Sequence, residues 1–336
     1  MKISASLYSN KDRSLESLVT ELDKCHIDLF HIDSNDDLSV FDDITEIRKI
    51  SNTPIDLHII SDEPEKYYDL IVKHQVEYVS FQYENFKGQK KEFPASEGTS
   101  YGLAVTSDTS VQVFEEYYDQ CDYVLIMTTT PGQSGGKFRK DNFKKIREFR
   151  NSYPSKSIQV DGGVNDEVGF LMRMLGVDSV VSGSYLVKHE SIGMALLHLR
   201  SSIIHSDYKI KDFMIDLTDA PVMKNEIATT QNIIENIEYH KKGFTCLVNA
   251  EGFLTGISSN ADVRRGLIKN IEDFNKITEK DIINSNPVTI SEDATISEML
   301  QLVKSKNFLI SFLPVVDSSK KLTGCITFFN LIRSES

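Results

Sequence analysis

Short β-branched or apolar runs recur along the first 190 or so residues, and a loop and a helical stretch follow most of them. Eight such runs are visible: 3–7, 27–32, 55–60, 78–81, 101–105, 123–127, 157–160 and 179–181. Strands that alternate with helices predict parallel βαβ units, and eight units in this length predict a closed (β/α)8 barrel. An open, doubly wound sheet is the main alternative, because strand runs alone do not reveal closure.

The segments between these runs carry apolar residues at helical spacing. Candidate helices are 15–24, 65–73, 111–118 and 141–150, and a final helix at about 191–203 is expected to seal the barrel. In such a barrel the C-terminal ends of the strands surround one opening, where active sites form. Residues at those strand ends are therefore the candidates for chemistry.

The pattern changes after residue 207, where the remaining 130 or so residues contain an internal repeat. Residues 247–249 reappear as 315–317, and residues 254–257 reappear as 322–325. Three single positions continue the match at the same spacing of 68 residues: Ser259 with Thr327, Asp262 with Asn330 and Arg265 with Arg333. We expect a barrel domain at 1–203, a linker at 204–209, and two repeats at 210–268 and 278–336.

Composition narrows the class of protein. The 336 residues are 40% hydrophobic, yet no apolar run approaches the ~20 residues needed to cross a bilayer, and no signal-peptide pattern opens the chain. The net charge of −13 argues against sequence-independent binding to nucleic acid or to an anionic membrane, since both depend on a basic surface. Four scattered cysteines without CxxC spacing are expected to be reduced and buried. We therefore expect a cytoplasmic protein.

Two histidines and two aspartates fall at the ends of three predicted strands. His31 and Asp33 are two apart at the end of the second run, so strand alternation puts both on the inward face. His58 ends the third run and Asp161 follows the seventh. Each residue alone has a structural explanation, such as a satisfied buried histidine or a helix N-cap. Their joint occurrence favours one divalent cation: Zn²⁺, Mn²⁺, Fe²⁺, Co²⁺ or Mg²⁺.

Glycine-rich loops follow the sixth, seventh and eighth predicted strands. Their candidate anion-binding residues are Gly132, Gln133, Ser134, Gly135, Gly162, Gly163, Gly183 and Ser184. Glycines let backbone N–H groups approach a phosphate closely, and the following helix N-terminus adds a favourable dipole. Each loop alone could be a tight turn, but three consecutive loops beside a metal site favour a phosphate site.

These motifs, taken in order along the chain, resemble those of the ribulose-phosphate 3-epimerase family. The segment 31–33 resembles its H-x-D metal motif and 56–58 its D-x-H motif, and Ser6 falls at its substrate-contacting serine. The segments 102–105, 127–132, 160–164 and 182–184 follow in family order, so the resemblance spans about residues 1–200. It implies that His31, Asp33, His58 and Asp161 hold a divalent metal and that the glycine loops hold a substrate phosphate.

The resemblance implies epimerisation at C3 of a ketose phosphate, such as ribulose 5-phosphate, xylulose 5-phosphate or a related sugar. Lewis acidity of the metal would stabilise the enediolate that forms when the C3 proton leaves. Epimerisation needs an acid/base group on each face of this intermediate, and Asp33 and Asp161 are the carboxylates for that role.

The chain departs from the family where a substrate would lie. Asn35-Asp36-Asp37 replaces Met, Asp and Gly; Ile60 replaces a methionine; Gln82 replaces a histidine; and Thr130 replaces an asparagine. Met127 is the one methionine of the family's cap over the metal that is kept. We interpret this as a changed sugar specificity, because a decayed enzyme would be expected to lose metal ligands as well.

The two C-terminal repeats resemble a tandem pair of CBS domains, small β-α-β-β-α modules that usually bind adenine nucleotides. The segment 256–262 resembles the family's G-h-x-[ST]-x-x-D signature, in which the hydroxyl and the carboxylate contact ribose. This implies nucleotide contacts at Ser259 and Asp262, and at Thr327 and Asn330 in the second repeat, where the acid is lost. An AMP-, ADP- or ATP-type regulator is one expectation, and dimerisation is the alternative.

The sequence therefore favours a metal-dependent 3-epimerase that is regulated through its CBS pair and forms a homo-oligomer. By analogy with CBS pairs of similar ending at 262–265, it could serve the synthesis of surface-polysaccharide precursors. One alternative is a sugar-phosphate sensor without turnover. Another is decarboxylation or aldol cleavage, which is disfavoured because no lysine falls at a strand end beside the site.

Overall fold

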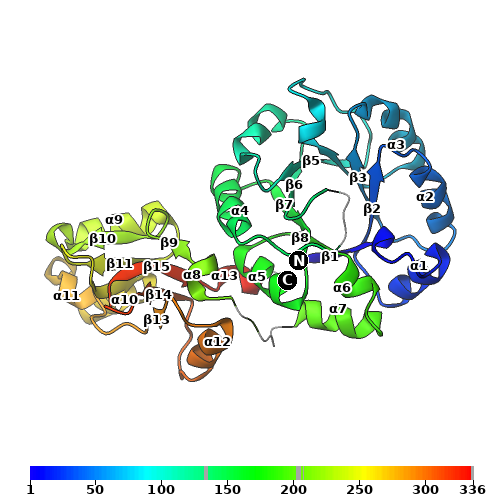
Figure 1. Cartoon of the computed structure of the whole chain (residues 1–336). Helices are drawn as coiled ribbons and strands as arrows, with labels where there is room; N and C mark the ends of the chain where they lie inside the picture. Colours follow the sequence, from blue (N-terminus) through cyan, green and yellow to red (C-terminus); the bar gives the residue numbers. More distant parts are fainter. Residues whose placement is uncertain (132–134, 202–205, 207, 334–336) are drawn as a thin grey trace. The chain divides into compact units, whose positions relative to one another are not determined.

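The computed structural model describes residues 1–131, 135–201, 206 and 208–333 (Figure 1). Contacts divide the chain into two compact units, Met1–Ile204 with Asn330–Ser336, and His205–Phe329. Within the described residues, every helix is too short or too polar to cross a lipid bilayer.

The first unit is built on a closed barrel of eight parallel strands in sequence order, which confirms the predicted fold class. The strands are β1 (Lys2–Ser6), β2 (Leu29–Asn35), β3 (Ile55–Ile60), β4 (Tyr78–Gln82), β5 (Ser100–Thr106), β6 (Tyr123–Met127), β7 (Ser157–Asp161) and β8 (Ser179–Ser182). Closure comes from pairing of β1 with β8, so the open sheet is excluded. All eight predicted runs contain a strand.

Helices surround the barrel (Figure 1). They are α1 (Leu15–Lys24), α2 (Val40–Arg48), α3 (Tyr68–His74), α4 (Asp141–Ser152), α5 (Asp166–Leu175), α6 (Ser184–Val187) and α7 (Ile192–Arg200), with 3-10 turns η1 (Leu7–Ser9), η2 (Pro64–Tyr67), η3 (Tyr83–Phe86) and η4 (Val111–Tyr117). The predicted helix at 15–24 has the observed bounds. Ser14 caps its first turn by accepting a hydrogen bond from the N–H of Ser17, at 3.3 Å.

The expected helix at 111–118 is a 3-10 helix and not an α-helix. Its buried residues are Val111, Phe114 and Tyr117, which recur every three residues. A spacing of three matches the 3-10 helix, in which side chains at i and i+3 lie above one another.

Strand alternation separates an apolar outer face from a polar interior. Ile3, Phe30 and Leu57 are fully buried against the helix layer. Ser4 and Asp56 point into the barrel, where the Ser4 hydroxyl donates to the Asp56 carboxylate at 2.8 Å. Both side chains are fully buried, so this hydrogen bond compensates for lost contacts with water.

The second unit contains two sheets with the same local order of elements. One repeat comprises β10 (Val222–Lys224), η5 (Asn225–Ile227), α9 (Thr230–His240), β11 (Phe244–Val248), β12 (Leu254–Ser259) and α10 (Asn260–Lys269). The other comprises β13 (Ile290–Ser291), α12 (Ile296–Lys304), β14 (Phe312–Val316) and β15 (Leu322–Thr327). The helix α13 (Phe329–Arg333) follows β15 in the sequence, and from Asn330 on it groups with the first unit. The elements α8 (Ile210–Phe213), β9 (Ile215–Asp216), η6 (Phe274–Lys276) and α11 (Glu279–Ile282) flank or join the two repeats.

The strand register reproduces the sequence repeat. Phe244 pairs with Ser259 in one sheet, and Phe312 pairs with Thr327 in the other. Both hairpins contain a register shift, between Leu247 and Val248 and, 68 residues later, between Val315 and Val316. The predicted β-α-β-β-α order is therefore present twice.

The cysteines follow the sequence expectation with one exception. All four are free; Cys121, Cys246 and Cys325 are buried, whereas Cys25 is only partly buried. Cys25 is the C-cap residue of α1, and a helix end at the rim of the barrel leaves its side chain partly accessible.

Candidate metal centre

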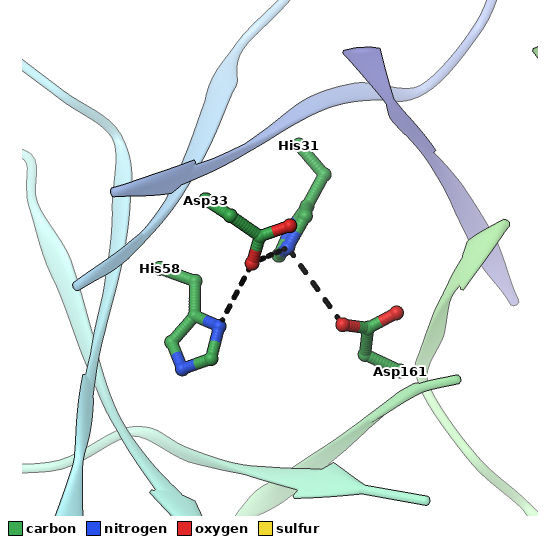
Figure 2. A group of neighbouring side chains, drawn as sticks. All are labelled: His31, Asp33, His58 and Asp161. Carbon is green, nitrogen blue, oxygen red and sulfur yellow. Dashed lines mark hydrogen bonds and ion pairs between the residues drawn. The ribbon is translucent and has the colours of Figure 1, made fainter. Parts of the chain in front are cut away.

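The four predicted ligands meet at the C-terminal edge of the barrel. His31 and Asp33 come from β2, His58 from β3 and Asp161 from the end of β7. One ligand atom from each lies within 4.8 Å of the others (Figure 2). Register explains part of this, because Asp33 lies directly opposite His58 across the β2–β3 pair.

Asp33 is the centre of the cluster. Its Oδ1 lies 3.3 Å from Nε2 of His31 and 3.1 Å from Nδ1 of His58. Oδ2 of Asp161 lies 3.9 Å from the same His31 Nε2. Both imidazoles are fully buried, but the Asp33 side chain is 17% exposed and the Asp161 side chain is 16% exposed. The two carboxylates therefore face the opening of the barrel.

The Asp56 carboxylate holds the His31 ring through its Nδ1. Its Oδ2 accepts hydrogen bonds from His31 Nδ1 at 2.8 Å, Ser4 Oγ at 2.8 Å and Gln159 Nε2 at 2.6 Å. Since an ionised carboxylate only accepts, His31 donates a proton from Nδ1, and Nε2 is the ring nitrogen that can bind a cation once its own proton is lost.

Gln82 holds His58 on the opposite ring nitrogen. Its Oε1 lies 2.8 Å from His58 Nε2, so that nitrogen donates and Nδ1 is the ring nitrogen that can bind a cation. Two imidazole nitrogens and two carboxylates thus converge on one point. Such a donor set fits a divalent cation, and partners that fix each histidine tautomer are usual around metal sites.

The cluster separates the protonation behaviour of its two carboxyl groups. Burial alone would raise the pKa of Asp33, but His31 and His58 outweigh it and hold this pKa below its usual range. Burial raises the pKa of Asp161 to about 6, and the Asp33 charge adds to this effect. For His31, burial lowers the pKa, but Asp56 and Asp33 raise it well above the usual value. One ionised and one readily protonated carboxyl group are the requirement for acid/base work.

The described residues of the predicted phosphate loops lie at the same end of the barrel. Gly162 and Gly163 follow β7, and Gly183 and Ser184 follow β8. Gly135 lines a pocket of about 600 Å³ with residues that follow β5 and β6. The predicted residues Gly132, Gln133 and Ser134 fall outside the described residues.

Among the predicted phosphate glycines, Gly162, Gly163 and Gly183 cannot be replaced without movement of a neighbouring group. Gly163 has φ +65°, and a Cβ there would overlap the backbone N–H of Phe138. A Cβ on Gly183 would lie 2.5 Å from Oγ of Ser9, which hydrogen bonds Oγ of Ser6 at 2.9 Å. Ser6 and Gly183, predicted to contact substrate, therefore meet across Ser9.

The predicted nucleotide residues lie at matching places in the two repeats. Ser259 ends β12 and caps α10, and the buried Asp262 carboxylate accepts hydrogen bonds from the Ser259 N–H, at 3.0 Å, and its hydroxyl. Thr327 ends β15, and Asn330 lies in α13. Arg265 donates to the other oxygen of Asp262. In the structure the first pair acts as a helix cap.

Sequence reasoning did not identify the two residues that hydrogen bond the candidate histidine ligands, Asp56 and Gln82. Asp56 stands two positions before His58 and directly opposite His31, so strand alternation and register were the available signals. Gln82 was noted only as a departure. Its contact with His58 depends on the β3–β4 register, which single runs do not fix.

Comparisons with known proteins agree with both resemblances. A model of the ribulose-phosphate 3 epimerase family matches residues 2–187, and a CBS domain model matches residues 280–336. Ribulose-phosphate 3-epimerase of Bacillus subtilis (strain 168) is 28% identical over 215 residues, covering 60% of this chain and 99% of that protein. The same enzyme of Aquifex aeolicus (strain VF5) is 30% identical over 167 residues, covering 48% and 75%.

Solved structures of CBS-pair proteins are also similar to part of the chain. The crystal structure of CBSX2 in complex with AMP is 23% identical, with a TM-score of 0.32, and covers 38% of this chain and 96% of that chain. The structure of CBSX2 from Arabidopsis thaliana is 22% identical, with a TM-score of 0.32, and covers 39% and 95%.

Proposed function

This chain belongs to the ribulose-phosphate 3-epimerase family, and from that membership we propose that its barrel epimerises a ketose phosphate at C3. Ribulose 5-phosphate, xylulose 5-phosphate or a related sugar phosphate is the substrate class. His31, Asp33, His58 and Asp161 would hold one divalent cation.

The observation that carries the proposal is the contrast within the cluster. The histidines are fully buried, whereas Asp33 and Asp161 retain exposure toward the opening. They come from β2 and β7 and approach His31 from different strands. Two carboxylates from different strands, both exposed at the opening, suit proton removal from one face of a substrate and proton delivery to the other.

The chain's own residues account for most of the chemistry. One carboxylate removes the C3 proton, and the other returns a proton to the opposite face of the enediolate. When bound, the cation supplies Lewis acidity toward the substrate carbonyl. Asp56 and Gln82 keep both imidazoles from rotating.

The phosphate is expected at Ser6, Gly135, Gly162, Gly163, Gly183 and Ser184. Backbone N–H groups would supply its partners, which suits a protein whose net charge is −13. The absence of a side chain at Gly163 lets the loop after β7 pack against the backbone of Phe138 at this end of the barrel.

Solvent exchange tests the proposal. Purified protein, analysed for bound metal, is incubated in D₂O with a panel of pentulose and hexulose phosphates, and deuterium at C3 is followed by NMR. We expect exchange with at least one of them, dependent on metal, and in Asp161→Asn we expect exchange from only one of the two C3 epimers. Tight sugar-phosphate binding without exchange in the metal-loaded protein would instead indicate a sensor.

We further propose that residues 210–268 and 278–336 form a CBS pair that binds an adenine nucleotide and regulates the barrel, with self-association of the chain. The doubled register of the two hairpins supports the pair. Ser259 and Asp262 are the proposed ribose contacts, with Thr327 and Asn330 in the other repeat. Calorimetric titration of the whole protein with AMP, ADP and ATP tests this, with Asp262→Asn expected to weaken binding. Failure of all three nucleotides to bind would leave self-association, measured by sedimentation, as the role of the pair.

A further inference from the structure

The contact that holds His58 continues beyond Gln82. Gln82 is 2% exposed, and its amide oxygen faces His58 Nε2 at 2.8 Å. Its amide nitrogen donates to the Glu84 carboxylate and, at 3.4 Å, to the carbonyl of Ala104. A chain of hydrogen bonds therefore runs from the rim of the barrel to a metal-facing imidazole.

Glu84 is itself fixed as an acceptor. Its Oε1 accepts from the N–H of Thr106 at 2.9 Å and from the hydroxyls of Thr106, at 3.0 Å, and Thr109. Burial of the carboxylate favours a higher pKa, but these hydrogen bonds outweigh it and the pKa of Glu84 lies below its usual value. The ammonium of Lys145 donates to the carbonyls of Thr106 and Thr109, which fixes the turn that presents the donors.

These partners leave Gln82 one orientation. Both the Glu84 carboxylate and the Ala104 carbonyl accept only, so the NH₂ group must face them and the oxygen must face His58. If the amide were reversed, an oxygen would face a carboxylate, and NH₂ would face His58 Nε2. That ring nitrogen would then have to accept, and its proton would move to Nδ1, where it points at Asp33 and blocks the cation.

We propose that Glu84 and Gln82 are positioning residues that hold His58 in the Nε2–H tautomer and so keep Nδ1 free to bind the metal. The inference rests on the metal site of the proposed function. The two histidines would therefore bind the metal through different ring nitrogens: His31 through Nε2, because Asp56 anchors its Nδ1, and His58 through Nδ1, because Gln82 anchors its Nε2. Glu84 acts only through Gln82, not by direct contact with a ligand.

A double-mutant cycle on metal affinity separates this role from a general effect of charge. Zn²⁺ is titrated into metal-free wild type, Glu84→Gln, Gln82→Leu and the double variant, in competition with a chromophoric chelator. We expect each single variant to bind about 10–100-fold more weakly, as for other partners of metal ligands. In the Gln82→Leu background, Glu84→Gln should cause no further loss. Equal losses in both backgrounds would show that Glu84 acts as a charge or a fold element, and would overturn the relay.

Asp62→Asn is the matched control, because it removes one carboxylate charge at the barrel rim, where Asp62 pairs with Lys87 and Asn85. It should leave Zn²⁺ affinity unchanged. Urea unfolding of each variant shows whether a loss of affinity reflects a loss of fold.

The tautomer can be observed without metal or activity. Long-range ¹H–¹⁵N correlation of [¹⁵N]histidine-labelled protein, recorded at a pH where the His58 ring is neutral and assigned with His58→Gln, should show His58 protonated on Nε2 in the wild type and shifted toward Nδ1–H in Glu84→Gln. An Nδ1–H tautomer in the wild type would overturn the inference. Since this spectrum is recorded on metal-free protein, it decides the relay even if the wild type binds no metal, in which case the proposed function fails separately.

Discussion

The rings of Phe244 and Phe312 stack face to face, with 4.0 Å between their centroids and 4° between their planes. The two residues are 68 positions apart and begin equivalent strands, β11 and β14. Phe312 packs against the buried cluster that contains Phe244. The stack therefore joins the two repeats at equivalent positions of their strands.

Truncation of this stack should destabilise the second unit unequally. Phe244 is fully buried and Phe312 only partly, so we expect Phe244→Ala to cost about 3–5 kcal/mol and Phe312→Ala clearly less. Urea unfolding followed by circular dichroism measures both, and the double variant should fall short of additivity. Phe308→Ala, at a side chain that is 57% exposed, is the control and should change little. Equal losses of stability in Phe244→Ala and Phe312→Ala would contradict the expectation that the more deeply buried ring contributes more.

Asp56 should matter for metal affinity although it touches no metal. Asp56→Asn keeps the size of the side chain but removes the charge that three donors share. We expect about 10–100-fold weaker metal binding, because the His31 tautomer is no longer fixed. A loss of roughly 1–3 kcal/mol of stability should accompany it. Metal titration and urea unfolding provide the measurements. Asp69→Asn, on the exposed face of α3, is the control, and an unchanged metal affinity in Asp56→Asn would refute the role.

Removal of either carboxylate of the proposed mechanism should abolish a different half of the reaction. With one acid/base group lost, the other can still exchange the C3 proton of the epimer that it faces, but it cannot invert the centre. We therefore expect Asp33→Asn and Asp161→Asn each to reduce epimerisation by about 10²-fold or more. Each should retain some deuterium exchange, from opposite epimers, when excess metal is supplied. Exchange from the same epimer in both variants would exclude a two-carboxylate mechanism.

Acid should weaken the connection between α10 and α11 through one carboxyl group. The Lys269 ammonium and the N–H and hydroxyl of Thr278 lower the pKa of Asp281 to about 2. Since the unfolded chain has the usual aspartate pKa of about 3.9, the stabilisation is complete above that pH and is lost as the pH falls toward 2.

The comparison of wild type with Asp281→Ala tests whether the stabilisation from Asp281 falls or rises as the pH is lowered. The difference between their urea midpoints should be largest above about pH 4 and should narrow as the pH falls. Glu279→Ala, at an exposed position of the same short helix, is the control. A difference that widens in acid would mean that Asp281 is not ionised in the fold.

The barrel could be predicted because each of its strands must be apolar on the face that meets the helices. That requirement is visible in the sequence as eight short runs. The predicted ligands were brought together for a related reason: parallel strands end at one edge, so His31, His58 and Asp161 had to approach one another. The helix at 15–24 was predicted with its bounds, because its apolar residues recur at helical spacing. For the segment 111–118 the 3-10 form was not predicted, because apolar residues three positions apart also occur on one face of an α-helix.

The sequence by itself determined the number and order of the barrel strands, the four candidate ligands and the internal repeat, because these depend on periodicities of two, 3.6 and 68 residues within one chain. The tertiary structure decided which partner each polar side chain meets. Asp56 meets His31 through the β2–β3 register, and Gln82 meets His58 through the β3–β4 register. Closure of the barrel, by the pairing of β1 with β8, was likewise decided in three dimensions. Register and closure depend on hydrogen bonds between segments far apart in the chain, and no local pattern specifies them.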